Sequence, residues 1–197
     1  MRYFIFLLLL VSCTSQPQQK VLFVGNSITF HGESPTIGWY GNWGMAASAL
    51  QKDYVHIVAA KLKADFQILP ISRWEWNYSD TTGFAEAKKY DADILIFRLG
   101  ENVSDMEGYQ DAFTDLISGF LTNNTKQVIV TNNFWNDALK DSIQREVAKD
   151  YTFVDISALD KDSANHAWGE YVLSGICQHP SDLGMLRIAE LICDSIK

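Results

Sequence analysis

Five short apolar segments, separated by longer amphipathic stretches, constrain the fold of this chain more than any other feature. The segments are rich in branched and aromatic residues, and they cover residues 21–24, 66–70, 94–97, 128–131 and 153–156. Between them, apolar residues recur at intervals of three and four, which predicts helices at about 44–63, 83–90, 107–122, 136–149 and 182–196. Strands that alternate with helices form a parallel sheet with right-handed crossovers. The sequence therefore predicts an α/β chain folded as a three-layer α/β/α sandwich.

Composition narrows the class of protein further. The chain of 197 residues carries 24 acidic and 16 basic side chains, for a net charge of −8. A single domain of this size buries roughly two thirds of its unfolded surface, so it needs no disulfide framework, and we expect no structural metal and no cofactor. Nucleic acid is not an expected partner, because the chain has no Lys/Arg patch with which to grip phosphates. The acidic balance favours a small or neutral substrate.

The first residues indicate export rather than folded structure. An apolar run over residues 3–11 follows one basic residue and is shorter than the ~20 residues that span a bilayer. Its end, Leu10-Val11-Ser12-Cys13, resembles a bacterial lipobox, in which the cysteine is lipidated and becomes the new N-terminus. The alternative is an ordinary secretory signal with a coincidental cysteine. We expect a signal peptide at 1–12, a lipidated tether at 13–19 and one folded domain at 20–197, anchored through Cys13 to a membrane of the bacterial envelope on its periplasmic or surface face.

Three motifs follow predicted strands or precede the last helix, where parallel sheets bind their ligands. Gly25-Asn26-Ser27-Ile28-Thr29 follows the first strand, Gly100-Glu101-Asn102 follows the third, and His179-Pro180 comes just before the last helix. A serine hydroxyl is a weak nucleophile that needs a base to accept its proton, and an amide N–H can stabilise a developing oxyanion. Serine, histidine and asparagine at this edge of the sheet therefore indicate acyl transfer.

In this order, the three motifs resemble those of the SGNH/GDSL hydrolases. The first varies the usual Gly-Asp-Ser-(Leu/Ile), the second matches Gly-x-Asn, and the third carries the late histidine of the family. The resemblance implies a flavodoxin-like, five-stranded parallel sheet in the order 2-1-3-4-5. It also implies an esterase site in which Ser27 is the nucleophile, His179 the base, and the Asn102 side chain and the Ser27 backbone N–H are oxyanion donors.

The chain departs from the family pattern in the loop after the second strand. The family supplies a third oxyanion donor there from a glycine, but this loop contains no glycine until Gly83. A backbone N–H does not require glycine, so we expect Ser72 or Arg73 to donate instead.

A second departure concerns the acid of the catalytic triad. In the family it usually lies three residues before the histidine, and here that position is Ile176. Three alternatives remain open: the Ile176 carbonyl orients His179 in a Ser–His dyad, a carboxylate such as Glu75 or Glu101 replaces the acid, or the protein is inactive. We favour the dyad.

Five aromatic residues lie in loops close to the predicted site. They come from the long glycine-rich loop after the nucleophile and from the loop after the second strand: Trp39, Tyr40, Trp43, Trp74 and Trp76. Such side chains can form a stacking platform for sugar rings or a wall for an acyl group. The alternative is that they pack as a small core under a long loop.

Together these features predict a serine esterase that removes small acyl groups by way of an acyl-enzyme on Ser27. The tryptophan-rich loops and the acidic charge favour an acetylated carbohydrate as the substrate. An arylesterase, a thioesterase or a lysophospholipase with the same residues is an alternative. So is a glycan-binding lipoprotein that has lost catalysis, because the acid is missing at Ile176.

Overall fold

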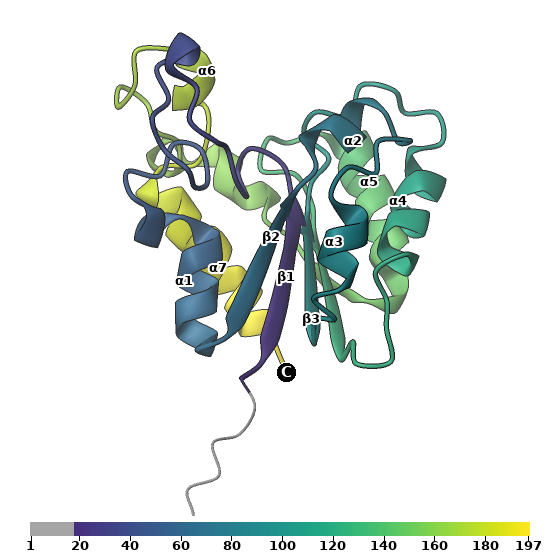
Figure 1. Ribbon diagram of the computed structural model, residues 1–197. Coiled ribbons are helices and arrows are strands. Elements are labelled where there is room, and N and C mark those ends of the chain that lie inside the picture. Colours follow the sequence, from purple (N-terminus) through teal and green to yellow (C-terminus); the bar gives the residue numbers. More distant parts are fainter. Residues whose placement is uncertain (1–17) are drawn as a thin grey trace, which may run out of the picture.

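The computed structural model of the chain describes residues 18–197, which form a five-stranded parallel sheet covered by helices (Figure 1). The predicted signal peptide and Cys13 lie outside these residues. The strands are β1 (Lys20–Gly25), β2 (Asp65–Pro70), β3 (Ile94–Arg98), β4 (Gln127–Thr131) and β5 (Thr152–Val154). Their order is β2-β1-β3-β4-β5, and every neighbouring pair is parallel. Both the predicted three-layer architecture and the predicted strand order are confirmed.

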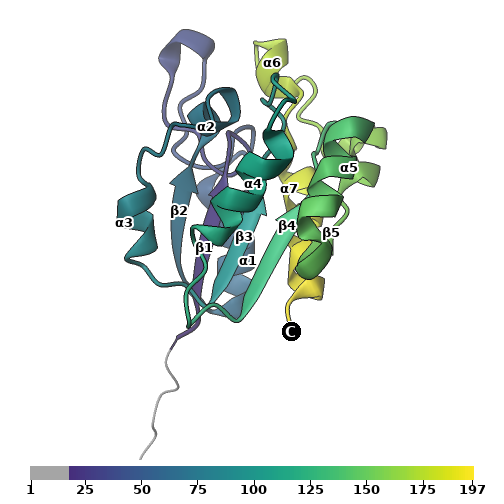
Figure 2. The same ribbon diagram turned by 90° about the vertical axis from the view of Figure 1, so that its right-hand side faces the viewer.

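Helices cover both faces of the sheet (Figure 2). On one face lie α1 (Tyr54–Leu62) and α7 (Asp182–Ser195), and on the other lie α3 (Phe84–Lys88), α4 (Tyr109–Ser118) and α5 (Ala138–Val147). Two short helices, α2 (Ser72–Trp76) and α6 (Ser174–Cys177), stand beyond the carboxyl ends of the strands. Five 3-10 turns complete the described elements: η1 (Pro35–Ile37), η2 (Leu50–Lys52), η3 (Ala148–Asp150), η4 (Ser157–Lys161) and η5 (Ser163–Asn165).

The side chains of β1 show how the sheet acquires two cores. Val21 and Phe23 point into the layer of α1 and α7, while Leu22 and Val24 point into the layer of α4 and α5. All four are buried, as expected for a central parallel strand that is covered on both faces. Burying a side chain of this size contributes about 1.5–3 kcal/mol, and because successive side chains of a strand point to opposite faces, β1 contributes to both cores.

The helix predicted at about 44–63 begins only at Tyr54. Asp53 is its N-cap, because its carboxylate accepts from the backbone N–H of His56 at 2.8 Å, and it also accepts from the Gly44 N–H at 3.0 Å. A Cβ at Gly44 would overlap the Ile28 carbonyl oxygen. These contacts hold the segment before Tyr54 in an irregular path against the nucleophile loop.

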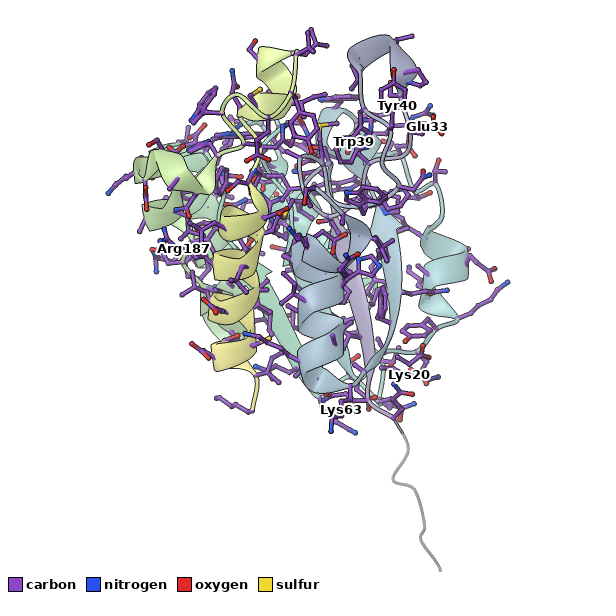
Figure 3. The ribbon with its side chains drawn as sticks, turned by 90° about the vertical axis from the view of Figure 1, so that its left-hand side faces the viewer. Lys20, Glu33, Trp39, Tyr40, Lys63 and Arg187 are labelled. Atoms are coloured by element: carbon purple, nitrogen blue, oxygen red, sulfur yellow. The ribbon has the colours of Figure 1, made fainter. Side chains whose placement is uncertain are left out.

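The strands of the sheet run from one end of the molecule to the other. Lys20 and Lys63 lie at the amino end of the strands, and Trp39 and Tyr40 lie in the long loop at the carboxyl end (Figure 3). Strand β1 has six residues and therefore spans about 20 Å between these ends. Within residues 18–197, no helix has the length and apolarity needed to cross a bilayer.

Candidate active site

Ser27 and His179, 152 residues apart in the chain, meet at the carboxyl end of the sheet. Ser27 lies two residues after β1, and its Oγ is 3.0 Å from Nε2 of His179. A Cβ at Gly25 would overlap the Arg98 carbonyl oxygen, so only glycine allows this loop to pass so close to β3. His179 comes just before α7, whose N-cap is Ser181. The geometry is that of a nucleophile and its general base.

The second ring nitrogen of His179 is held by a backbone carbonyl. Nδ1 lies 2.9 Å from the carbonyl oxygen of Gly175, four residues earlier. A carbonyl only accepts, so Nδ1 carries the proton and Nε2 is free to accept from the Ser27 hydroxyl. The prediction that the Ile176 carbonyl orients this ring is wrong by one residue. That carbonyl accepts from the backbone N–H of His179 at 2.9 Å, which closes the turn after α6.

Burial sets the protonation state of His179. Its side chain is 9% exposed, and this loss of solvation lowers the pKa of the imidazole to about 4. The Gly175 carbonyl opposes the shift, while the Arg98 guanidinium adds to it. The ring is therefore neutral at neutral pH, as a general base must be before it takes a proton.

Neither Glu75 nor Glu101 hydrogen-bonds to His179, so the alternative in which one of them orients the base is also wrong. Glu75 accepts from the side chains of Asn102 and Asn26, at 2.6 and 3.1 Å, and from the backbone N–H of Gly100. Its burial, and then the nearby charge of Glu101, raise the pKa of the Glu75 carboxyl, while its three donors oppose that rise. Both carboxylates hydrogen-bond to the Asn26 side chain, and the His179 ring is held by the Gly175 carbonyl instead.

Arg98 is a buried residue of the site that the sequence analysis missed. It is the last residue of β3, is fully buried, forms an ion pair with Glu101 and donates to the Asn26 side chain at 2.9 Å. Glu101 also accepts from Asn26, at 2.6 Å, and from the backbone N–H of Phe134, at 2.9 Å. An arginine at the end of an apolar strand, three residues before a glutamate, was the available signal, because a buried charge requires a partner.

The four predicted oxyanion donors lie in the nucleophile loop, in the loop after β3 and at the start of α2. Asn102 commits one Nδ2 hydrogen to Glu75, and among the described residues the second has no partner. The backbone N–H of Ser27 likewise donates to no described protein atom. Ser72 and Arg73 open α2, so their N–H groups face no carbonyl of that helix. The donor roles of all four residues stay predictions.

The five predicted aromatic residues divide by burial. Trp39 and Trp74 are 2% and 3% exposed and pack inside the protein, which favours for them the alternative of a small core under the loops. The ring of Trp39 packs edge-on against half-buried Trp43 and donates from Nε1 to the His31 carbonyl. Tyr40 and Trp76 are exposed, which leaves these two and Trp43 as candidates for substrate contact.

Trp135 lies beside His179, although the sequence analysis did not select it. Its ring meets the imidazole of His179 edge-on, with centroids 5.1 Å apart, and its Nε1 donates to the Gln178 carbonyl at 3.0 Å. A small pocket of about 120 Å³ adjoins it, lined by Glu101, Asn133, Trp135, Asn136, Asp137 and Lys140. The signal was its position in the loop after the fourth strand, at the edge where ligands bind.

No family model matches this chain, and no curated protein is significantly similar to it in sequence. Several solved structures do share its architecture. The acetyl xylan esterase Axe2 from Geobacillus stearothermophilus is 18% identical, with a TM-score of 0.58 over 90% of this chain and 94% of that one. The acetyl xylan esterase AlAXEase is 15% identical, with a TM-score of 0.61 over 90% of this chain and 100% of that one.

A third structure carries the family name. The lipolytic protein of the G-D-S-L family from Desulfitobacterium hafniense is 15% identical, with a TM-score of 0.56 over 91% of this chain and 100% of that one. At these identities the similarity establishes a shared fold.

Proposed function

We propose that this chain, which has the fold of the SGNH/GDSL esterases, is a serine esterase that hydrolyses small acyl esters. One observation carries the proposal. The Oγ of Ser27 lies 3.0 Å from Nε2 of His179, while Nδ1 of the same ring is held by the Gly175 carbonyl. This is a nucleophile paired with a base of fixed tautomer, which is the arrangement that acyl transfer requires.

In the first half of the reaction, Oγ of Ser27 attacks the carbonyl carbon of the ester while Nε2 of His179 takes the hydroxyl proton. The carbonyl oxygen becomes an oxyanion, which receives hydrogen bonds from the Asn102 amide and the Ser27 backbone N–H, with the N–H of Ser72 or Arg73 as a third donor. A donor of this kind contributes roughly 3–4 kcal/mol when it is tested by removal. Collapse of the intermediate breaks the ester bond, and His179 returns the proton to the departing alcohol.

In the second half, a water molecule attacks the acyl-enzyme and gives its proton to His179. The tetrahedral intermediate collapses, Ser27 recovers its proton and the free acid leaves. The imidazolium formed in each half donates from Nδ1 to a neutral carbonyl rather than to a carboxylate. A carbonyl fixes the tautomer but stabilises the positive ring less than a carboxylate does, so we expect a modest kcat.

An acetylated carbohydrate is the substrate class that we propose. Two structures of the same fold belong to acetyl xylan esterases. Exposed Tyr40 and Trp76 offer aromatic faces on which sugar rings can stack, and the pocket beside Trp135 is lined mainly by polar side chains. A panel of acetylated xylo-oligosaccharide, aryl acetate, thioester and lysophospholipid separates this substrate class from the alternatives.

The test compares purified wild type with Ser27→Ala and His179→Ala on p-nitrophenyl acetate and on an acetylated xylo-oligosaccharide. We expect each variant to lose about 10³-fold or more in kcat/KM. Ser118→Ala, at an exposed position on α4, is the matched control and should match wild type. Wild-type activity no higher than that of Ser27→Ala on either ester would overturn the proposal and direct attention to glycan binding without hydrolysis.

We also propose that a lipid on Cys13 anchors the protein to a bacterial envelope membrane, on the basis of the lipobox-like sequence. Lys20 begins β1 at the end of the domain away from Ser27, so an anchor before Lys20 leaves the site on the far side of the domain, within reach of a polymer. Labelling of the full chain with a fatty acid in a bacterial host should be lost in Cys13→Ser and kept in Cys193→Ser. Label retained in Cys13→Ser would contradict the anchor.

A further inference from the structure

Glu75 is a buried carboxylate that joins three separate parts of the active site. Its side chain comes from α2 and is 1% exposed. Its three hydrogen-bond donors are the Asn26 side chain, in the nucleophile loop, and the Gly100 N–H and the Asn102 side chain, in the loop after β3. Residues 25 to 49 positions away in the sequence thus meet at one side chain.

The contact with Asn102 decides how that amide is presented. An amide side chain can turn over, exchanging its oxygen for its nitrogen. A carboxylate only accepts hydrogen bonds, so Oε2 of Glu75, 2.6 Å from Nδ2 of Asn102, selects the orientation with the nitrogen toward Glu75. Nδ2 has two hydrogens, and fixing the first also fixes the direction of the second.

The contacts of Oε1 hold the loops on either side. The Gly100 N–H donates to this atom, and Gly100 has φ +124°, a conformation that disfavours other residues. Asn26, next to the nucleophile, donates to the same oxygen at 3.1 Å. Glu75 therefore joins the nucleophile loop directly to the Asn102 amide, while Arg98 and Glu101 hold Asn26 from the other side.

A neutral side chain cannot replace this carboxylate, because three donors need three accepting lone pairs on two oxygens. Burying the charge is costly, and the second carboxylate nearby, Glu101, adds to the cost. The buried guanidinium of Arg98 pairs with Glu101 and offsets part of that charge. A carboxylate buried here despite this desolvation cost points to a role in the site.

We infer that Glu75 is a positioning residue for ester hydrolysis, which holds the Asn102 amide toward the oxyanion that forms when Ser27 attacks. The inference rests on the proposed function. Glu75 does not touch the substrate, so its effect on the reaction passes through Asn102.

A double-mutant cycle in kcat for p-nitrophenyl acetate tests this inference. Glu75→Gln keeps the shape of the side chain but places an NH₂ group where one of the accepting oxygens stood. Asn102→Ala removes the amide itself, and its kcat should fall by about 10²-fold or more. Glu75→Gln should lower kcat by about tenfold or more and change KM by less than about threefold, because the lost interaction acts in the transition state.

The double variant Glu75→Gln/Asn102→Ala distinguishes positioning from a merely structural role. If Glu75 acts through Asn102, the double variant has a kcat within about threefold of Asn102→Ala alone. Losses that multiply, or a Glu75→Gln variant with the kcat of wild type, would overturn the inference. Glu86→Gln, at an exposed carboxylate on α3, is the matched control and should leave kcat unchanged.

If Glu75→Gln does not fold by circular dichroism, the same cycle is run with Glu75→Asp, which keeps the charge but shortens the side chain by one methylene and withdraws it from Asn102. Failure of the proposed function gives a different result, since wild type would then be no more active than Ser27→Ala. A kcat of Asn102→Ala equal to that of wild type would overturn the inference while leaving the Ser27 nucleophile intact.

Discussion

His179 takes its orientation from the main chain at Gly175, whose carbonyl oxygen lies 2.9 Å from Nδ1. The two residues are four apart, at the one-turn helix α6, so the ring folds back onto the turn that precedes it. The base of the proposed dyad is therefore positioned locally, by backbone geometry. The carboxylates of the site bind other groups: Glu75 accepts from Asn26 and Asn102, and Glu101 forms an ion pair with Arg98.

The titration of His179 follows from its burial. Because desolvation lowers the pKa of the ring to about 4, it should stay neutral as the pH falls from 7 to 5 and take up a proton only near pH 4. The NMR signal of the ring, assigned by its loss in His179→Gln, should titrate with a midpoint near 4. A midpoint at or above 6.5 would show that the ring is solvated or paired with an acid.

The same shift makes stability depend on pH. The ring in the unfolded chain is protonated below about pH 6.5, whereas the folded ring stays neutral to about pH 4. The unfolded state therefore binds more protons in this window, and the stability contributed by His179 is lost as the pH falls through it. In urea denaturation, the free energy of unfolding of wild type should therefore fall relative to that of His179→Gln as the pH decreases from 6.5 to 4. A constant difference would contradict the shift.

Restoring an acid at position 176 should not restore a triad. The Ile176 side chain is buried in an apolar cluster with Trp39, Met45 and Ala167, and Gly175 already occupies Nδ1 of His179. We expect Ile176→Asp to lower the free energy of unfolding by about 3 kcal/mol or more, with no gain in kcat. Ile176→Val, as the conservative control, should cost about 0.5–1.5 kcal/mol. A faster and equally stable Ile176→Asp enzyme would contradict this account.

Removal of Arg98 should be far more destabilising than removal of an exposed arginine. Arg98→Met leaves the buried Glu101 carboxylate without its partner, which costs about 3–5 kcal/mol. Arg145→Met breaks an exposed ion pair with Asp155 and should cost about 1 kcal/mol or less. Chemical denaturation of the two variants measures the contrast, and equal costs would mean that the Arg98–Glu101 pair contributes no more than an exposed one.

Gly100 should tolerate substitution less well than Gly108, although both have positive φ. A Cβ at Gly100 would overlap the Gln144 amide, whereas nothing lies within 4 Å of a Cβ at Gly108. Gly108→Ala should cost about 1–2 kcal/mol for its backbone conformation alone. Gly100→Ala should cost more, and should also lower kcat, because the loop carries Asn102. Similar free energies of unfolding for the two variants would show that the crowding is relieved elsewhere.

The sequence alone predicted the layers, the strand order and the residues at the catalytic edge. Continuous apolar runs such as that of β1 specify parallel strands buried on both faces, and that topology brings Ser27, Asn102 and His179 to one edge. These properties depend on local periodicity and on the resemblance of three motifs to a known family, both of which can be read along the chain. The helix at Tyr54 began ten residues later than predicted because Asp53, as its N-cap, and Gly44 hold the preceding segment against another loop.

What only the tertiary structure decided is which group each polar side chain faces. The Ile176 carbonyl was the favoured group to orient His179, with Glu75 and Glu101 as alternatives, and in the structure the Gly175 carbonyl takes this position. Burial likewise separated Trp39 and Trp74 from Tyr40 and Trp76. Hydrogen bonds and burial depend on distances of a few ångströms between residues far apart in the sequence. The periodicity of apolar residues does not encode such distances, so these contacts are determined only when the chain has packed.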